Sequence, residues 1–305
     1  MKFIRHIAAL LVILLLLTPV ALAQDTEEEV AEFANPEILV DTDWILENTG
    51  EEGIVLLFIG GELEDYEAEH IPGALFVSLA DLNNPEDDVT GQIGTSEQVA
   101  ETLGSLGIEA DDTVVLYDAS NNLLAARAFW VLKYYQHENV VIYEGGSKLW
   151  EADGQEFVSG DAPEVEAVDY EIAEADPEIR TTGDYVLEHL DDAGVQLCDT
   201  RSINEYIGTD VRADRGGHIP GAISLEWVNT VDPQTGKFKT YDELDELFKL
   251  AGFDREKQII TYCQTGVRGA HVWFVLRELL GYEDVRNYDG SWIEYGNNLE
   301  APIEN

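Results

Sequence analysis

A single cysteine lies where the local structure of the chain would activate it. Cys263 follows the short apolar segment Gln258–Tyr262 and opens the loop Cys263–Arg268, which reads CQTGVR and is followed directly by a helical pattern. Between the carboxyl end of a strand and the amino end of a helix, free backbone N–H groups and the positive helix end favour thiolate over thiol. The sequence therefore predicts that Cys263 is a nucleophile.

The rest of this loop is suited to binding an anion. Its central glycine lets the backbone amides curl around one point and form a nest, and Arg268 adds a positive charge at the rim. A buried cysteine in a tight turn is the alternative interpretation. It does not explain why thiolate position, nest and arginine coincide.

The elements that position the loop occur twice. His70–Ala74 and His218–Ala222 both read HIPGA, and further matches follow at a constant offset of 145 residues, the spacing between positions 118 and 263. The elements matched at this offset are the capping boxes Thr95–Gln98 and Thr240–Glu243, the strands Thr113–Tyr117 and Gln258–Tyr262, and the helices Leu123–Tyr135 and Arg268–Leu280. Upstream, outside this constant offset, the strand Gly53–Ile59 pairs with Gly194–Thr200. Short apolar strands alternating with amphipathic helices predict an α/β fold of two tandem domains, each a mostly parallel sheet flanked by helices.

The two copies differ at the chemically important position. Residues 36–152 are expected to form the first domain and residues 178–300 the second, joined by an acidic linker at 153–177. In the first domain Asp118 stands in place of Cys263, and its loop has neither a central glycine nor a closing arginine. Because a carboxylate would repel an anionic substrate, the first domain is predicted to be inactive and to form one wall of a cleft over the other domain's loop.

The N-terminus is predicted to be a targeting segment. Two basic residues precede the apolar run Ile7–Leu17, and Ala21 and Ala23 occupy the positions that a signal peptidase reads. Residues 1–23 are thus expected to be a signal peptide and residues 24–35 an acidic disordered segment. An uncleaved anchor is the alternative, but the apolar run is too short to span a membrane comfortably. The expected location is periplasmic or extracellular.

Composition excludes several classes of function. The 305 residues include 17 Lys and Arg against 62 Asp and Glu, a formal net charge of −45 at pH 7. Such a charge repels nucleic acid and anionic membrane surfaces, so neither is expected as a partner. Two cysteines exclude a disulfide-stapled scaffold, and six histidines without metal-type spacing make a metal or other cofactor unexpected. The protein is expected to be a monomer.

Taken together, the motifs resemble those of tandem-domain rhodaneses, which are thiosulfate sulfurtransferases. The resemblance covers nearly all of residues 36–300 and rests on the Cys263–Arg268 loop, both HIPGA motifs, Leu197–Arg201 and Tyr288–Trp292. It implies a catalytic C-terminal domain, an inactive N-terminal domain and a cysteine persulfide intermediate.

The resemblance also implies a reaction. Cys263 would take the outer sulfur of thiosulfate and release sulfite, and cyanide or a thiol would then remove that sulfur, as in other ping-pong schemes. The partners would be a small anionic sulfur donor and a thiol or cyanide acceptor. The persulfide would be held by the loop residues Gln264, Thr265, Gly266, Val267 and Arg268.

Three further residues are candidates for substrate binding. The resemblance places Arg201 beside the site, where it either contacts substrate or braces the loop; an ion pair with Asp199 or Glu205 is the alternative. Arg215, in an insertion that the first copy lacks, is a candidate to line the cleft, against the alternative of a solvated loop charge. His70 precedes a Pro-Gly turn, where a structural role competes with the participation implied by related mercaptopyruvate enzymes.

Rival functions share this cysteine. A 3-mercaptopyruvate sulfurtransferase usually has Gly and Ser after the cysteine and an arginine at the position of Glu205, whereas this loop continues with Gln264 and Thr265. A Cdc25-type phosphatase needs five residues between cysteine and arginine, and this loop has four. A non-enzymatic persulfide carrier needs the same activated cysteine and stays open.

The second cysteine is assigned to the core. Cys198 lies in the middle of a strand that should be buried, so a packed thiol is expected. A regulatory disulfide with Cys263 is the alternative, and it would need Cα atoms within about 7 Å.

Overall fold

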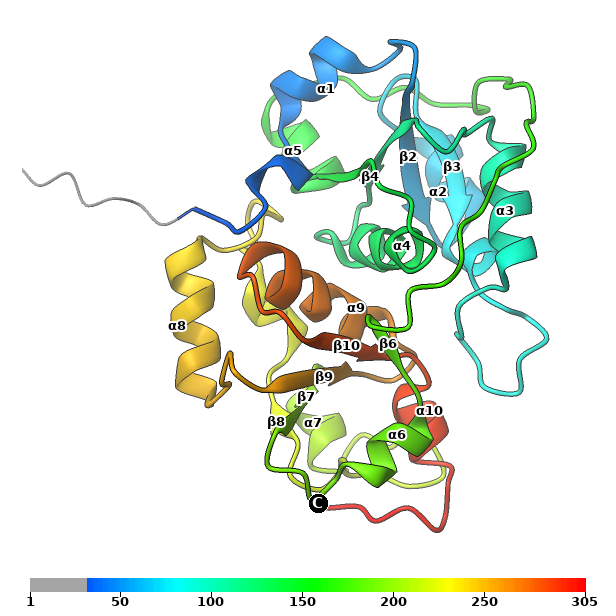
Figure 1. Cartoon of the computed structure of the whole chain (residues 1–305). Helices are drawn as coiled ribbons and strands as arrows, with labels where there is room; N and C mark the ends of the chain where they lie inside the picture. Colours follow the sequence, from blue (N-terminus) through cyan, green and yellow to red (C-terminus); the bar gives the residue numbers. More distant parts are fainter. Residues whose placement is uncertain (1–31) are drawn as a thin grey trace, which may run out of the picture. The chain divides into compact units, whose positions relative to one another are not determined.

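The computed structural model describes residues 32–305, and the predicted signal peptide 1–23 lies outside the described residues. Two five-stranded sheets form the framework (Figure 1). The first has the order β1 (Leu39–Val40), β5 (Val140–Tyr143), β4 (Thr113–Tyr117), β2 (Ile54–Gly60) and β3 (Leu75–Ser78). The second has the order β6 (Arg180–Thr181), β10 (Val285–Tyr288), β9 (Gln258–Tyr262), β7 (Val195–Asp199) and β8 (Ile223–Ser224). Both sheets are parallel throughout and have the same topology.

The helices also occur in matching order. The first domain contains α1 (Thr42–Asn48), α2 (Leu63–Ala68), α3 (Ser96–Ser105), α4 (Leu123–Tyr134) and α5 (Gly146–Ala152). The second contains α6 (Gly183–Glu188), α7 (Ile203–Tyr206), α8 (Tyr241–Ala251), α9 (Val267–Phe274) and α10 (Ser291–Tyr295). Within residues 32–305, no helix is both long enough and apolar enough to cross a membrane. The predicted fold class is confirmed.

Local sequence signals explain most of these limits. The strands predicted at Thr113–Tyr117 and Gln258–Tyr262 have those bounds, and both predicted capping boxes start their helices, α3 and α8. The helix predicted to run to Leu280 instead becomes π-helical over Val275–Leu279. There the Leu280 N–H donates to the Val275 carbonyl, five residues back, a widening that hydrophobic periodicity does not reveal.

The acidic linker is fixed to the first domain. The Val168 N–H donates to the Gly104 carbonyl and the Asp176 N–H to the Tyr134 carbonyl. Gly104 is required for this close approach, because a Cβ at that position would meet the Val168 carbonyl oxygen at 2.5 Å. The linker therefore covers α3 and α4 as part of the folded first domain.

One apolar core extends across both domains. Helix α4 packs on the first sheet, α9 packs on the second, and the two helices pack on each other. Phe129 and Phe274 meet edge to face with ring centroids 4.8 Å apart. Since each helix begins at the end of its domain's loop, this contact holds the loop of Asp118 and the loop of Cys263 in one rigid frame.

Candidate active site

The loop of Cys263 is held from behind by one hydroxyl. Cys263 follows β9 and is 1% exposed, and Gly266, at the amino end of α9, has the left-handed φ of +80° that favours glycine. The Ser291 hydroxyl oxygen accepts the N–H groups of Cys263, at 3.1 Å, and Gly266, at 3.0 Å. Ser291 therefore ties both ends of the turn to the start of α10.

The remaining amides of the loop are open. Five backbone N–H groups form no hydrogen bond with any residue in the range 32–305: those of Gln264, Thr265, Val267, Arg268 and Gly269. Unpaired amides converging at a helix amino terminus make a binding place for an anion. This agrees with the nest that the sequence predicts.

The equivalent loop of the first domain binds its own anion. Asp118 is fully buried, and its carboxylate accepts four backbone N–H groups at 2.6–3.0 Å, from Ser120, Asn122, Leu124 and Ala125. Burial raises the pKa of Asp118, and these hydrogen bonds oppose that rise. At the 145-residue offset, three of the four donors correspond to open amides, those of Thr265, Val267 and Gly269. The first domain thus has the same nest, filled by a side chain.

Arg268 lies at the rim, as predicted, but its charge is already paired. Its two terminal nitrogens donate to the Glu205 carboxylate at 2.7 and 2.9 Å. The Arg268 side chain is 17% exposed and that of Glu205 is 1% exposed. Burial works against the charge on Glu205, yet the guanidinium of Arg268 lowers the pKa of this carboxyl to about 2. Sequence reasoning considered Glu205 as a partner for Arg201 and as the position of an arginine in mercaptopyruvate enzymes, but not as the partner of Arg268.

Arg201 forms an ion pair, one of its two predicted alternatives. Its guanidinium lies 2.6 Å from the Asp199 carboxylate and donates to the Gly217 carbonyl at 2.7 Å. It also lies over the Trp292 ring, 4.5 Å from its centroid. The backbone N–H of Trp292 donates to the Cys263 carbonyl at 2.9 Å. The buried Arg201 therefore supports the loop indirectly, by packing on Trp292, instead of facing substrate.

Arg215 is part of the framework. Its guanidinium donates to four backbone carbonyls of the C-terminal segment: those of Tyr295, Gly296, Asn298 and Ala301. The cleft role expected for Arg215 therefore does not match its contacts, since its donors are used internally. Arg212 is the exposed arginine of the insertion; its backbone carbonyl accepts a hydrogen bond from the Gln264 side chain at 2.8 Å.

His70 is buried in a turn. Its ring stacks on Tyr66 with centroids 3.8 Å apart, and its Nδ1 lies 2.8 Å from the Tyr66 carbonyl oxygen. His218 stacks on Tyr206 in the same way, so the HIPGA motif has one structural role in both copies. None of the contacts described for His70 involves the loop of Cys263.

Cys198 is a fully buried core thiol in β7, and burial raises its pKa well above the usual value. Both cysteines are free thiols, so the alternative of a disulfide between Cys198 and Cys263 is not found.

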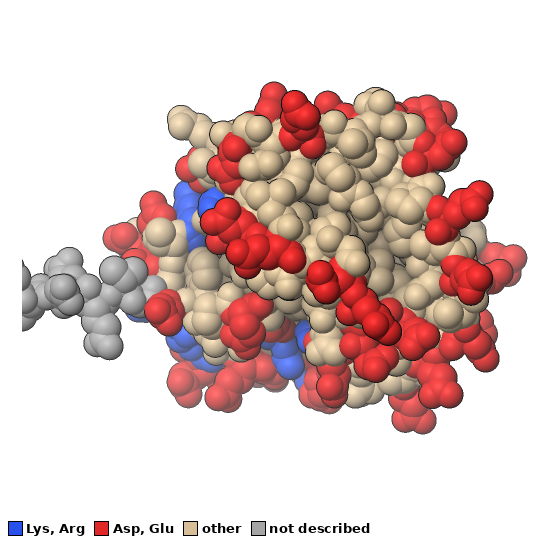
Figure 2. All heavy atoms as spheres, turned by 90° about the horizontal axis from the view of Figure 1, so that it is seen from above, with Lys and Arg blue, Asp and Glu red and all other residues tan. Residues whose placement is uncertain are grey.

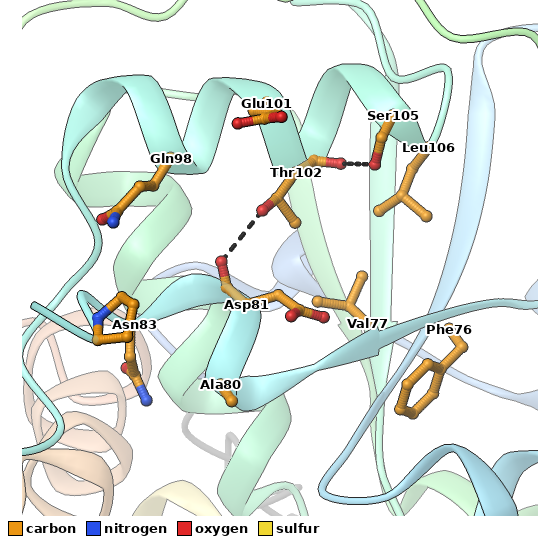
Figure 3. Close-up of a pocket in the computed structure, with 11 residues that line it drawn as sticks. Phe76, Val77, Ala80, Asp81, Asn83, Gln98, Glu101, Thr102, Ser105 and Leu106 are labelled. Carbon is orange, nitrogen blue, oxygen red and sulfur yellow. Dashed lines mark hydrogen bonds between the residues drawn. The ribbon is translucent and has the colours of Figure 1, made fainter.

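The first domain covers the loop of Cys263 directly. Gly91 lies so close to Thr265 that a Cβ at position 91 would be 3.0 Å from the Thr265 Cβ. A cavity of about 490 Å³ lies elsewhere in the first domain, between η2 (Leu79–Leu82) and α3, with Asp81, Gln98 and Glu101 in its lining (Figure 3). It contains no residue of the Cys263 loop.

Comparison with known proteins gives the class to which this site belongs. The family of the rhodanese-like domain matches residues 41–153 and again residues 182–298. The chain belongs to the rhodanese family and carries two such domains, and the match supports sulfurtransferase activity.

Individual relatives agree with this family. A Saccharopolyspora erythraea protein named "Putative thiosulfate sulfurtransferase" is 39% identical, with 88% of this chain and 96% of that protein covered. The Thermus thermophilus protein named "Sulfur carrier protein TtuD" is 38% identical, with 89% and 98% covered. The structure of an anaerobic ergothioneine biosynthesis enzyme from Chlorobium limicola is similar with a TM-score of 0.80 at 27% identity, with 89% of this chain and 71% of that chain covered.

Proposed function

We propose that this protein transfers the sulfane sulfur of thiosulfate to a thiol or to cyanide through a persulfide on Cys263. The observation that carries the proposal is the contrast between the two nests. The oxygens of Asp118 are two bonds beyond its Cβ, as the terminal sulfur of a cysteine persulfide would be. The filled nest of the first domain therefore marks where a negatively charged persulfide sulfur would lie in the second, against the amides of Thr265, Val267 and Gly269.

The reaction needs two displacements. In the first, the Cys263 thiolate forms a bond to the outer sulfur of thiosulfate, the sulfur–sulfur bond of thiosulfate breaks, and sulfite leaves with the electron pair. In the second, cyanide or a thiolate attacks the terminal sulfur and the Cys263 thiolate leaves. Because both leaving groups are anions, neither step requires a general acid, and the open amides stabilise the charge at the transferred atom.

We infer the choice between thiosulfate and 3-mercaptopyruvate as sulfur donor from the charged residues at the rim of the loop. The Glu205 carboxylate balances Arg268, so the rim has no free guanidinium at that position to bind the carboxylate of 3-mercaptopyruvate. Thiosulfate instead presents its reacting sulfur directly to the nest. This supports thiosulfate over the sister activity.

A persulfide carrier is the second candidate. The Thermus thermophilus relative, at 38% identity, is named a sulfur carrier, and a carrier would use the same cysteine and nest. A carrier would accept sulfur once and pass it to a partner thiol, with little turnover on small acceptors.

Mass spectrometry tests the proposal. Intact protein treated with thiosulfate should gain one sulfur atom and lose it on addition of cyanide, and Cys263→Ser should gain none. Steady-state turnover of thiosulfate with cyanide separates an enzyme from a carrier. If the wild-type protein gains no sulfur from thiosulfate but does so from 3-mercaptopyruvate, the donor assignment is wrong.

We also propose that the chain is exported, on the basis of residues 1–23 alone. N-terminal sequencing of the protein from its native cells should find Gln24 as the first residue. An intact Met1 would contradict export by cleavage.

A further inference from the structure

Each domain places a hairpin on the other domain's loop. The covering hairpin, residues 83–93 of the first domain, is closed by the antiparallel bridge Asn83–Ile93, and the counterpart hairpin, residues 231–238 of the second, by the bridge Val231–Phe238. Gly91 and Gly236 occupy equivalent positions, with φ of +87° and +75°. Gly91 lies against the loop of Cys263, and Gly236 lies against the loop of Asp118 in the first domain, the one proposed to be catalytically silent.

The two hairpins are anchored by the same kind of hydrogen bond. The Ile93 N–H donates to the Asp289 carboxylate at 2.9 Å, and the Phe238 N–H donates to the Glu144 carboxylate at 3.0 Å. Asp289 and Glu144 each directly follow the strand that pairs with the first strand of the sheet, β10 and β5. The exchange of hairpins therefore has approximate two-fold symmetry.

A buried arginine distinguishes the side of the Cys263 loop. Arg127, on α4 of the silent domain, is fully buried and donates to Asp289 at 2.7 Å and to the Gly91 carbonyl at 3.1 Å. Its counterpart at the 145-residue offset is Val272, which carries no charge. On the other side, the Gly236 carbonyl accepts a hydrogen bond from the neutral Asn122 side-chain amide at 2.8 Å. A buried ion pair adds little net stability once desolvation is counted, so its use at the loop of Cys263 points to a role in positioning.

The ion pair of Arg127 and Asp289 lies directly against the loop of Cys263. A Cβ at Gly266 would be 2.7 Å from the Asp289 carboxylate and 3.1 Å from an Arg127 terminal nitrogen. The same guanidinium holds Gly91, which contacts Thr265. Two consecutive residues of the nest are therefore packed against groups that Arg127 fixes.

We propose that Arg127 and the covering hairpin are positioning parts of the active site, through which the silent domain holds the Thr265 amide and the turn at Gly266 in the geometry that receives sulfur. This rests on the proposed function of Cys263. Preorganised donors stabilise a developing charge only when they do not have to move during the reaction, so a displacement of a few tenths of an ångström should slow sulfur transfer.

A matched pair of variants tests the hairpin. Gly91→Ala forces a methyl group onto Thr265. Gly236→Ala places one 3.4 Å from the Asn121 side chain of the Asp118 loop and 3.1 Å from the carbonyl oxygen of Gly145, which precedes α5. Both substitutions strain a left-handed residue, so both should lower the melting temperature similarly. We expect Gly91→Ala to slow persulfide formation at least tenfold, mainly in kcat, and Gly236→Ala to change it less than twofold.

A second readout does not depend on sulfur. At one fixed pH, iodoacetamide should alkylate Cys263 more slowly in Gly91→Ala than in the wild type, and at the wild-type rate in Gly236→Ala, as followed by peptide mass. Arg127→Lys keeps the charge but loses the two terminal nitrogens that reach Asp289 and Gly91. The alkylation rate of this variant should therefore lie between those of Gly91→Ala and the wild type.

The outcomes are distinct. Equal slowing in Gly91→Ala and Gly236→Ala, or slowing in neither, would show that the hairpin is only structural. If the wild type accepts no sulfur from thiosulfate, the proposed function fails, while the alkylation comparison still decides whether the silent domain positions Cys263.

Discussion

The loops of Asp118 and Cys263 use equivalent backbone amides for opposite purposes. In the silent domain a carboxylate fills the nest permanently, and the chain needs no ligand to satisfy its buried donors. In the catalytic domain Ser291 satisfies two N–H groups and the others stay open. These open donors leave the site ready to bind an anion.

The comparison also shows how one fold accommodates two different residues at the same position. An aspartate at the cysteine position removes the nucleophile and supplies the bound charge in one change. The silent domain then retains its helix α4, whose first turn donates to Asp118, and can use that helix to present Arg127 to the active site. A domain without the cysteine can therefore still support the loop of Cys263 through its helix α4.

The largest expected effect comes from making the two loops alike. Cys263→Asp should abolish sulfur transfer, since no thiol remains, and should keep or raise the melting temperature, since the carboxylate fills the open nest. Cys263→Ser is the control: it should be equally inactive and lack any gain in stability. Turnover assays and thermal unfolding of both variants check this. A large drop in melting temperature for Cys263→Asp alone would show that the two nests differ in shape.

Removing the Arg268 side chain from the rim of the loop should have the next largest effect. Although Arg268 is paired with Glu205, it also interacts with the Cys263 side chain, which contributes to raising the pKa of Arg268. Arg268→Ala should therefore lower kcat/KM for thiosulfate about tenfold, equivalent to about 1.4 kcal/mol of transition-state stabilisation. It should also destabilise the fold, because it leaves the buried Glu205 carboxylate without its partner. Arg268→Ala combined with Glu205→Gln should recover much of the stability and little of the activity. Full activity in the double variant would mean that the pair is purely structural.

The same pair predicts a pH dependence. The folded pKa of Glu205 is lowered to about 2, below its ordinary value of about 4.3. A depressed carboxyl pKa contributes stability that is complete above the unfolded value and is lost as pH falls through the folded value. Between about pH 4 and pH 2 the wild type should therefore lose more stability than Glu205→Gln does. Parallel unfolding curves of the two proteins would contradict the pairing.

A smaller effect on activity is expected in the silent domain. Asp118→Ala leaves four backbone donors without their acceptor and should cost about 1–3 kcal/mol of unfolding free energy. Turnover should stay within a few-fold of the wild type, because nothing around Asp118 can carry a persulfide. Urea unfolding and steady-state kinetics measure the two quantities. A complete loss of turnover in a folded variant would give the first domain a chemical part.

Local patterns made the fold and the loop predictable from sequence. Strand β9, the nest and the capping boxes depend on neighbouring residues, and the repeat confirmed each interpretation with a second copy. The partners of the arginines were not predictable in this way. Arg268 pairs with Glu205 across 63 residues, and Arg127 pairs with Asp289 across 162 residues. Such choices depend on which buried carboxylate the tertiary structure brings near, which spacing does not encode.

The smallest expected effect comes from the net charge of the whole surface, which opposes the local attraction of the nest for an anion. With 62 acidic and 17 basic residues the chain carries a net charge of −45, and acidic side chains far outnumber basic ones on the face shown in Figure 2. Thiosulfate is a dianion and is repelled at long range, while the open amides attract it only at contact. Salt shortens the screening length to about 8 Å near 0.15 M, so it should suppress the distant repulsion first.

Measurements over a series of salt concentrations would therefore separate the long-range repulsion of thiosulfate from its attraction at contact. From very low to moderate chloride, kcat/KM for thiosulfate should rise a few-fold and then level off or fall. The melting temperature should rise over the same range, because self-repulsion of the acidic fold is relieved. The surface acts on both wild type and Gly91→Ala, whereas the nest differs between them, so the rise should have the same relative size in both proteins. A steady decline of kcat/KM from the lowest salt upward would show that attraction at the loop dominates at every distance.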